Sequence, residues 1–273
     1  MEVKLFASGY CEALNIFLRR KPYFKKSRFY AVWLLIDHPV CGLILFDTGY
    51  TGHFYDSTYR FPDRLYRMVT PAYIDERDMI GAILERKGIQ CADIRWVIIS
   101  HFHADHISGL KLFPNAQFYT TRLAWQQVLT LQGLMAIKRG IIHNLIPDDF
   151  EERLSFIEDI GEKGIDTSGL VYYKLPQWPE IKLISLPGHA AGMIGLWIDR
   201  PDGPFIYATD AAWDSECFYE NKLPHPLAKL FFDDWSDYVD TWNKLHTIKS
   251  HYPQAKIYFT HSPDTLKICE HVV

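Results

Sequence analysis

The chain has 273 residues, of which 48% are hydrophobic, 15% aromatic and 23% charged, and its formal net charge is −4. These proportions are typical of one large globular domain and exclude a disordered or fibrous protein. The mildly acidic balance also argues against a nucleic-acid partner, because phosphates are bound by basic surfaces.

The cysteines and the apolar runs of the sequence predict the cellular compartment of the protein. Five cysteines are scattered along the chain and none forms a CxxC pair, so neither a disulfide framework nor a cysteine zinc site is indicated. No stretch approaches the roughly eighteen apolar residues of a membrane span, and the N-terminal residues lack a basic leader followed by an apolar core. The sequence therefore predicts a cytoplasmic protein with no membrane span.

Nine short runs rich in aliphatic, β-branched or aromatic residues predict strands. They cover residues 3–8, 30–36, 42–49, 96–100, 116–121, 181–188, 193–198, 204–210 and 255–261. The runs gather in two blocks, and each block is followed by helix-forming sequence. We therefore expect an α/β protein with two facing sheets and helices outside them.

Two segments carry the apolar spacing of an amphipathic helix. Residues 75–88 start at Asp75, a favourable N-cap, and stop at Gly88, which is suited to end a helix. Residues 234–253 have the same spacing and stop before a proline.

Residues 122–160 also favour helix and lie between the two strand blocks. We expect this segment to be a helical insertion or cap that shapes a pocket. No repeat of fixed period and no low-complexity linker divides the chain, so residues 1–273 are predicted to form a single domain.

The densest cluster of reactive side chains is the stretch SHFHADHISG at residues 100–109, directly after a predicted strand. His101 and His103 are two positions apart, so in extended backbone both side chains project to one side and can hold one ion. Once the chain turns, Asp105 and His106 can point elsewhere and serve a second metal. This density favours a metal site over a set of polar loop residues.

Three further candidate ligands follow later predicted strands. His189 comes after a Pro-Gly turn, Asp210 ends the run IYATD, and His261 ends the run IYFTH. Loops at strand ends can present such side chains into a common cleft. Taken singly, each has a plain alternative: a turn histidine, a helix-capping aspartate and a surface histidine.

Together, HxHxDH, a later Gly-His, a strand-end aspartate and a late histidine resemble the metallo-β-lactamase superfamily. The resemblance spans nearly the whole chain and includes the element FDTG at Asp47. It implies an αββα four-layer sandwich of two mixed sheets with helices outside and metals at one edge. Asp47 would then anchor the second ring nitrogen of a metal-binding histidine, with an ordinary turn aspartate as the alternative.

The same resemblance implies a complete ligand set for two metal ions, Zn²⁺ with Fe, Mn or Co as alternatives. The first ion would take His101, His103 and His189, the second would take Asp105, His106 and His261, and Asp210 would bridge them.

Within the superfamily the chain is most similar to the N-acyl homoserine lactonases, the quorum-quenching group. The similarity rests on residues 75–109, on the helical segment after FYTTRLAW and on the turn PGHAAGM. It implies a hydrolase whose partner is a small-molecule N-acyl homoserine lactone or similar ester, and a homodimer. A thioester hydrolase of the glyoxalase II kind, a phosphodiesterase and a non-catalytic metal-binding sensor are the alternatives.

The chemistry expected of such a site follows from its metals. Two cations lower the pKa of a shared water, which can then attack the carbonyl carbon, and the oxyanion is stabilised by a metal. By resemblance, Asp105 would carry a proton to the leaving group.

At one position the chain departs from the lactonases. These enzymes carry a tyrosine three residues after the bridging aspartate, where it binds the substrate carbonyl, whereas this chain has Trp213. An indole N–H donates a hydrogen bond but cannot accept one, so substrate activation would depend more on the metal or on another phenol. Trp213 is taken as a catalytic candidate, with core packing or a pocket wall as the alternative.

The stretch at residues 52–69 is rich in aromatic residues and follows the Asp47 element. We expect it to line a groove for an acyl chain, with ordinary core packing as the alternative. The candidates are Phe54, Tyr55, Tyr59, Phe61 and Tyr66.

Overall fold

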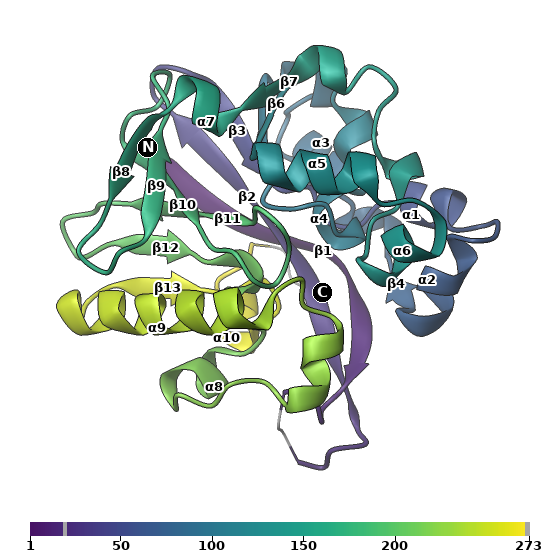
Figure 1. Cartoon of the computed structure of the whole chain (residues 1–273). Coiled ribbons are helices and arrows are strands. Elements are labelled where there is room, and N and C mark those ends of the chain that lie inside the picture. Colours follow the sequence, from purple (N-terminus) through teal and green to yellow (C-terminus); the bar gives the residue numbers. More distant parts are fainter. Residues whose placement is uncertain (19–20, 271–273) are drawn as a thin grey trace.

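The computed structural model describes residues 1–18 and 21–270, and it arranges them as two facing β-sheets flanked by helices (Figure 1). The first sheet has seven strands in the order β4-β1-β2-β3-β5-β6-β7. Their bounds are β1 Glu2–Leu14, β2 Lys26–His38, β3 Gly42–Phe46, β4 Ala72–Tyr73, β5 Trp96–Ile98, β6 Gln117–Thr120 and β7 Leu154–Phe156. The pairs among β4, β1, β2 and β3 are antiparallel, and those from β3 to β7 are parallel.

The second sheet has six strands in the order β13-β12-β11-β10-β9-β8. Their bounds are β8 Glu162–Ile165, β9 Val171–Lys174, β10 Ile181–Ser185, β11 Ile194–Ile198, β12 Phe205–Tyr207 and β13 Lys256–Tyr258. Both β10 and β12 are antiparallel to β11, and β13 is parallel to β12. Strands β10, β12 and β13 therefore run in one direction and end at the same edge of this sheet.

In residues 1–18 and 21–270, ten α-helices cover the sheets and fill the connections. Their bounds are α1 His53–Ser57, α2 Arg64–Val69, α3 Ile80–Arg86, α4 Ala104–Ile107, α5 Arg122–Thr130, α6 Gly133–Lys138, α7 Ile157–Ile160, α8 Ser215–Tyr219, α9 Trp235–His251 and α10 Pro263–Lys267. Figure 1 shows α9 lying along the second sheet, beside β13. In the described part of the chain, no helix is both long enough and apolar enough to cross a membrane.

Three layers of buried side chains hold these elements together. One layer lies between the first sheet and its helices, a second between the two sheets, and a third between the second sheet and α9. The alternation along β2 shows how one strand serves two layers: Ala31, Trp33 and Leu35 face the helices, whereas Val32, Leu34 and Ile36 face the other sheet. The predicted αββα four-layer sandwich is confirmed.

All nine predicted strands are present, but four others had not been predicted. Strand β4 is only two residues long, β7 lies within sequence that favours helix, and β8 has the polar sequence EKGI. Strand β9 has the sequence VYYK and pairs with β8 and β10. These strands are at or near sheet edges, where one face stays in solvent and the apolar pattern is weak.

The predicted helix at 75–88 starts later than expected. The Asp75 carboxylate accepts a hydrogen bond from the backbone N–H of Arg77, so it caps a single 3₁₀ turn and the α-helix begins only at Ile80. Gly88 ends the segment with a φ of 73°, a left-handed conformation that glycine tolerates. The predicted helix at 234–253 is confirmed as α9, whose N-cap Asp234 accepts from the N–H of Asp237.

The segment at 122–160 is only partly helical. It forms α5 and α6, but its later part supplies β7, which pairs parallel to β6. The expected helical insertion is present as α5, α6 and α7, and it also contains β7, because parallel neighbouring strands need a crossover connection and this segment provides it.

Candidate metal centre

The candidate ligands meet because several strands end at one edge of the sandwich. Strands β3 and β5 run parallel and lead to Asp47 and to the 100–109 stretch. In the second sheet β10, β12 and β13 lead to His189, Asp210 and His261. Side chains more than 150 residues apart in sequence are thereby brought to one place, as the strand-end pattern predicted.

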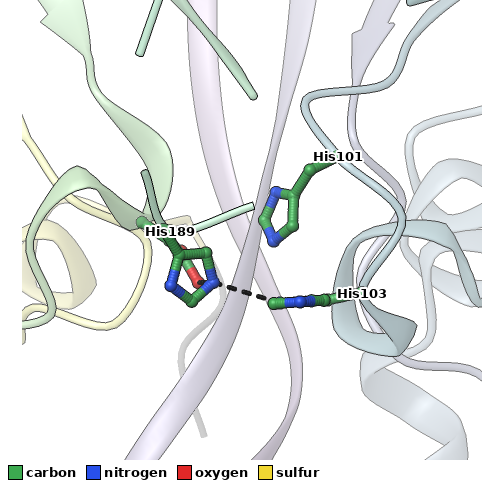
Figure 2. A group of neighbouring side chains, drawn as sticks. His101, His103 and His189 are labelled. Carbon is green, nitrogen blue, oxygen red and sulfur yellow. Dashed lines mark hydrogen bonds and ion pairs between the residues drawn. The ribbon is translucent and has the colours of Figure 1, made fainter. Parts of the chain in front are cut away.

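One group of donors comprises His101, His103, His189 and Asp210, whose ligand atoms all lie within 4.8 Å of one another. Figure 2 shows the three imidazoles turned toward one another from two sides of the site. The Nδ1 of His103 lies 3.1 Å from the Nε2 of His189, which in turn lies 3.2 Å from an Asp210 carboxylate oxygen.

A second group comprises Asp105, His106 and His261, again with ligand atoms within 4.8 Å. Asp210 lies between the two groups. One of its oxygens is 3.1 Å from the His261 Nε2 and the other is 3.7 Å from the His106 Nε2. All seven residues proposed from the sequence as ligands are therefore gathered in two adjoining groups, and Asp210 contacts members of both.

Hydrogen bonds outside the two groups fix the histidine rings. The His106 Nδ1 donates to the Asp47 carboxylate at 2.7 Å, and this carboxylate also accepts from the backbone N–H and the hydroxyl of Ser100. The His261 Nδ1 donates to the carbonyl oxygen of Tyr30 at 2.9 Å. In each ring the second nitrogen is thus left free to face the site.

Two residues with positive φ values support histidines of the site. Asp47 has a φ of 61°, which aspartate tolerates better than most residues. Gly140 has a φ of 68°, and a Cβ at this position would lie 2.5 Å from the ring of His103. The segment that carries Gly140 also pairs with His103 through its neighbour Ile141, so the loop after α6 holds this histidine in place.

Burial and mutual charge perturb the pKa values within the site. Burial lowers the pKa of His101 and of His103 well below the ordinary value, and neighbouring histidines act in the same direction. Burial acts to raise the pKa of Asp210, but His261 and His106 outweigh it and hold this pKa well below its ordinary value. His101 and His103 are thus neutral beside an ionised Asp210, which is the state in which these groups bind metals. Burial acts to lower the pKa of His106 and of His261 as well, but Asp105 and Asp210 outweigh it and raise both.

Several buried atoms of the site lack a hydrogen-bond partner among the described residues. They are the Nε2 of His101, the Nε2 of His106, the Nδ1 of His189 and an oxygen of Asp210. Leaving buried polar atoms unpartnered costs free energy, and each case in a native protein calls for an explanation. Nitrogen and carboxylate donors in this number suit divalent metal ions, so the donor set fits a dinuclear centre.

An apolar cleft of about 730 Å³ opens onto the donors. Five donors line it, namely His103, Asp105, His189, Asp210 and His261. Most of the rest of its wall comes from β1 and β2, from residues 66–71, from residues 137–140 and from residues 230–231. The volume and the largely apolar lining suit a small organic molecule.

The predicted aromatic groove is wrong at four of its five positions. Only Tyr66 lines the cleft. Phe54 is fully buried in the core against Tyr50 and Tyr66, and Tyr59 and Phe61 are exposed outside the cleft.

Tyr55 lines a different cavity of about 440 Å³. The helical turns of α1 send Phe54 and Tyr55 in different directions, and Tyr59 and Phe61 lie in the turn that joins α1 to α2.

Trp213 lies in the cleft wall beside the donors. Its ring centroid is 5.8 Å from that of His189, 5.9 Å from that of Phe29 and 5.0 Å from that of Phe232. It therefore stands in the pocket wall, one of the alternatives drawn from the sequence.

Sequence reasoning missed most of the wall. Phe17, Phe29, Tyr50, Ile137 and Phe231 line the cleft but were not singled out. The only available signals were the position of Tyr50 directly after the FDTG element and the expectation that residues 122–160 shape a pocket.

Comparisons with known proteins agree with this geometry. The sequence model of the family described as the metallo-beta-lactamase superfamily matches residues 28–261. The chain is 27% identical over 195 residues to N-acyl homoserine lactonase AttM of Azorhizobium caulinodans, covering 69% of this chain and 66% of that protein. It is 24% identical over 196 residues to N-acyl homoserine lactonase AiiA of Bacillus thuringiensis subsp. kurstaki, covering 71% and 68%.

The chain also spans only 61% of a second AttM, from Rhizobium radiobacter. It therefore covers slightly less than two thirds of the length of some of these relatives.

Solved structures share the fold. An N-acyl homoserine lactone hydrolase with the product N-hexanoyl-L-homoserine at its catalytic metal centre superposes with a TM-score of 0.71 and 20% identity, over 98% of this chain and 96% of that one. AidC, a dizinc quorum-quenching lactonase in complex with the same product, gives a TM-score of 0.65 and 19% identity over 96% and 88%.

Proposed function

The chain belongs to the metallo-β-lactamase superfamily, and from that premise we propose that it is a dinuclear metal-dependent hydrolase that opens the lactone ring of N-acyl homoserine lactones. One observation carries the proposal: two groups of buried donors, joined by Asp210, face an apolar cleft that can hold an acyl chain. The similarity to lactonases along about 70% of the chain supports the same substrate class.

We propose Zn²⁺ as the resident metal, with Fe, Mn and Co as alternatives that the same donors accept. His101, His103 and His189 would hold one ion, Asp105, His106 and His261 the other, and Asp210 both. When bound, two such ions supply Lewis acidity and lower the pKa of water.

The residues of the chain would perform the remaining steps. The Asp105 carboxylate lines the cleft and lies 3.5 Å from both His106 and His261, so it can pass a proton to the alcohol that leaves when the ring opens. Trp213 would hold the lactone against the donors through its ring. The apolar wall would bind the acyl chain and exclude water from it.

The proposal is tested by metal analysis of the purified protein followed by turnover of a substrate panel. The panel contains N-hexanoyl and N-dodecanoyl homoserine lactone, bis(p-nitrophenyl) phosphate and S-lactoylglutathione. We expect two divalent metals per chain and opening of the lactones. Cleavage of the phosphate ester or the thioester without lactone opening overturns the proposal in favour of those hydrolases, and bound metal without any turnover favours a sensor.

We further propose that the protein acts in the cytoplasm and forms a homodimer. The first point is supported by the cysteines, none of which is joined to another by a disulfide among the described residues. The second follows from the resemblance to lactonases and is tested by light scattering, where a mass of one chain would contradict it.

A further inference from the structure

Tyr50 is a buried phenol in the wall of the cleft whose hydroxyl has no hydrogen-bond partner among the described residues. Its side chain is 0% exposed, and its ring packs edge-on against Phe54 with centroids 5.1 Å apart. The backbone N–H of Tyr50 donates to the carbonyl oxygen of Ser8 at 3.0 Å, which ties the residue to β1. The Cys11 thiol and the Tyr66 phenol lie beside the hydroxyl, but neither forms a hydrogen bond of ordinary geometry with it, so packing holds the hydroxyl in place.

Tyr207 is another buried tyrosine, but its hydroxyl has hydrogen-bond partners. The Tyr207 hydroxyl donates to the carbonyl oxygen of Val32 and lies 3.0 Å from the Thr260 hydroxyl. An unpartnered buried hydroxyl costs free energy that such bonds offset. In the wall of a ligand cleft, that cost is removed when a ligand supplies an acceptor.

Tyr50 stays a hydrogen-bond donor in its surroundings. Burial raises its pKa well above the ordinary value, and the nearby thiol of Cys11 and carboxylate of Asp105 act in the same direction. The phenol is thus neutral at neutral pH. A neutral phenol can donate to a carbonyl oxygen, as a carboxylate cannot.

Two cationic groups of the cleft are already engaged. Lys26 pairs with Glu12 at 3.3 Å, and both lie toward solvent. Arg139 donates to the carbonyl oxygen of Phe232 and lies 3.7 Å from the Asp233 carboxylate. Tyr50 differs from them because it is fully buried, unpartnered and close enough to Asp105 to interact electrostatically.

The proposed substrate has two carbonyl groups and one apolar chain. The lactone is the group attacked, so it must meet the donor groups, and the acyl chain suits the apolar wall. The amide joins these two parts and must pass between them. Since Tyr50 lines the cleft near Asp105, its hydroxyl is suited to meet the amide.

We propose, on the basis of the function proposed above, that the Tyr50 hydroxyl donates a hydrogen bond to the amide carbonyl oxygen of a bound N-acyl homoserine lactone. Tyr50 is then a specificity-determining residue that favours lactones bearing an amide beside the ring. A single neutral hydrogen bond of this kind changes affinity by about tenfold.

The test compares Tyr50→Phe with the wild type on two lactones, N-hexanoyl homoserine lactone and γ-decalactone, which has no amide. We expect kcat/KM of the variant to fall about tenfold on the first lactone and to stay unchanged on the second. The melting temperature should not fall, because the variant loses a hydroxyl that makes no hydrogen bond in the free protein.

Tyr238→Phe is the matched control. Tyr238 is also 0% exposed with an unpartnered hydroxyl, but it does not line the cleft. This variant makes the same chemical change and should leave kcat/KM unchanged on both lactones.

Equal effects of Tyr50→Phe on both lactones, or no effect on either, overturn the assignment of Tyr50 while the proposed function stands. A wild type that opens neither lactone, or only γ-decalactone, overturns the proposed function itself and the Tyr50 assignment with it.

Discussion

The two ends of the cleft are built in different ways. At the donor end the side chains follow strands of both sheets, are buried except for the half-buried His103, and contact one another at 3.1 to 3.7 Å. At the other end short helices and loops complete the wall beside β1 and β2, and Val69 is 76% and Leu230 65% exposed. The donors are therefore tied to the rigid sheets, whereas the surface that would meet the proposed acyl chain can change without disturbing them.

The largest effect is expected where one residue joins both donor groups. Replacing Asp210 with Ala should abolish activity and lower the bound metal, because the carboxylate contacts His189, His106 and His261. Metal analysis and lactone turnover measure this. If two metals per chain remained, the bridging role of Asp210 would be wrong.

A smaller loss of metal affinity or activity is expected from a substitution at Asp47, which accepts a hydrogen bond from the metal-site histidine His106. In Asp47→Asn the charge opposite His106 is lost while the shape is kept, so metal affinity or activity should fall about 10- to 100-fold. Competition with a chelator gives the affinity, and a melting curve shows whether the fold is retained. Metal affinity and activity equal to those of the wild type would show that His106 does not depend on Asp47.

A substitution at Gly140 shows whether a change in the cleft wall can affect the donor end. A Cβ there would meet the His103 ring in a backbone conformation that strains other residues, at a cost of about 1 to 3 kcal/mol. Gly140→Ala should therefore lower metal occupancy about tenfold at limiting zinc, although the residue lies in the wall. Gly133→Ala in the same segment is the control, because it too has a positive φ but its Cβ meets no other atom. Equal losses in both variants would refute the link to His103.

The smallest effect is expected in the apolar wall. Phe231→Ala removes a half-exposed ring, so KM for N-dodecanoyl homoserine lactone should rise about fivefold while kcat and bound metal stay unchanged. Steady-state kinetics with the hexanoyl lactone, whose shorter chain covers less of the wall, provide the comparison. A loss of kcat or of metal would contradict the division between the two ends.

The sequence predicts the donor end of the cleft but not its wall. The two-residue spacing of His101 and His103, and the position of Asp210 after an apolar run, are local signals that strand geometry converts directly into a common edge. The wall carries no such signal. Phe54 and Tyr66 are twelve positions apart in similar sequence, yet packing buries one in the core and leaves the other in the cleft. Likewise, Asp75 is an apt N-cap, but it caps a 3₁₀ turn five residues before the α-helix begins.

Lactone opening is proposed to depend on two metal ions held by the seven donors. The most direct measurement removes the metal with a chelator, adds back Zn²⁺ in steps, and follows N-hexanoyl homoserine lactone opening against metal bound per chain. We predict that activity rises until two ions are bound per chain and then stays constant. Protein that holds two zinc ions per chain and opens no lactone would contradict the account.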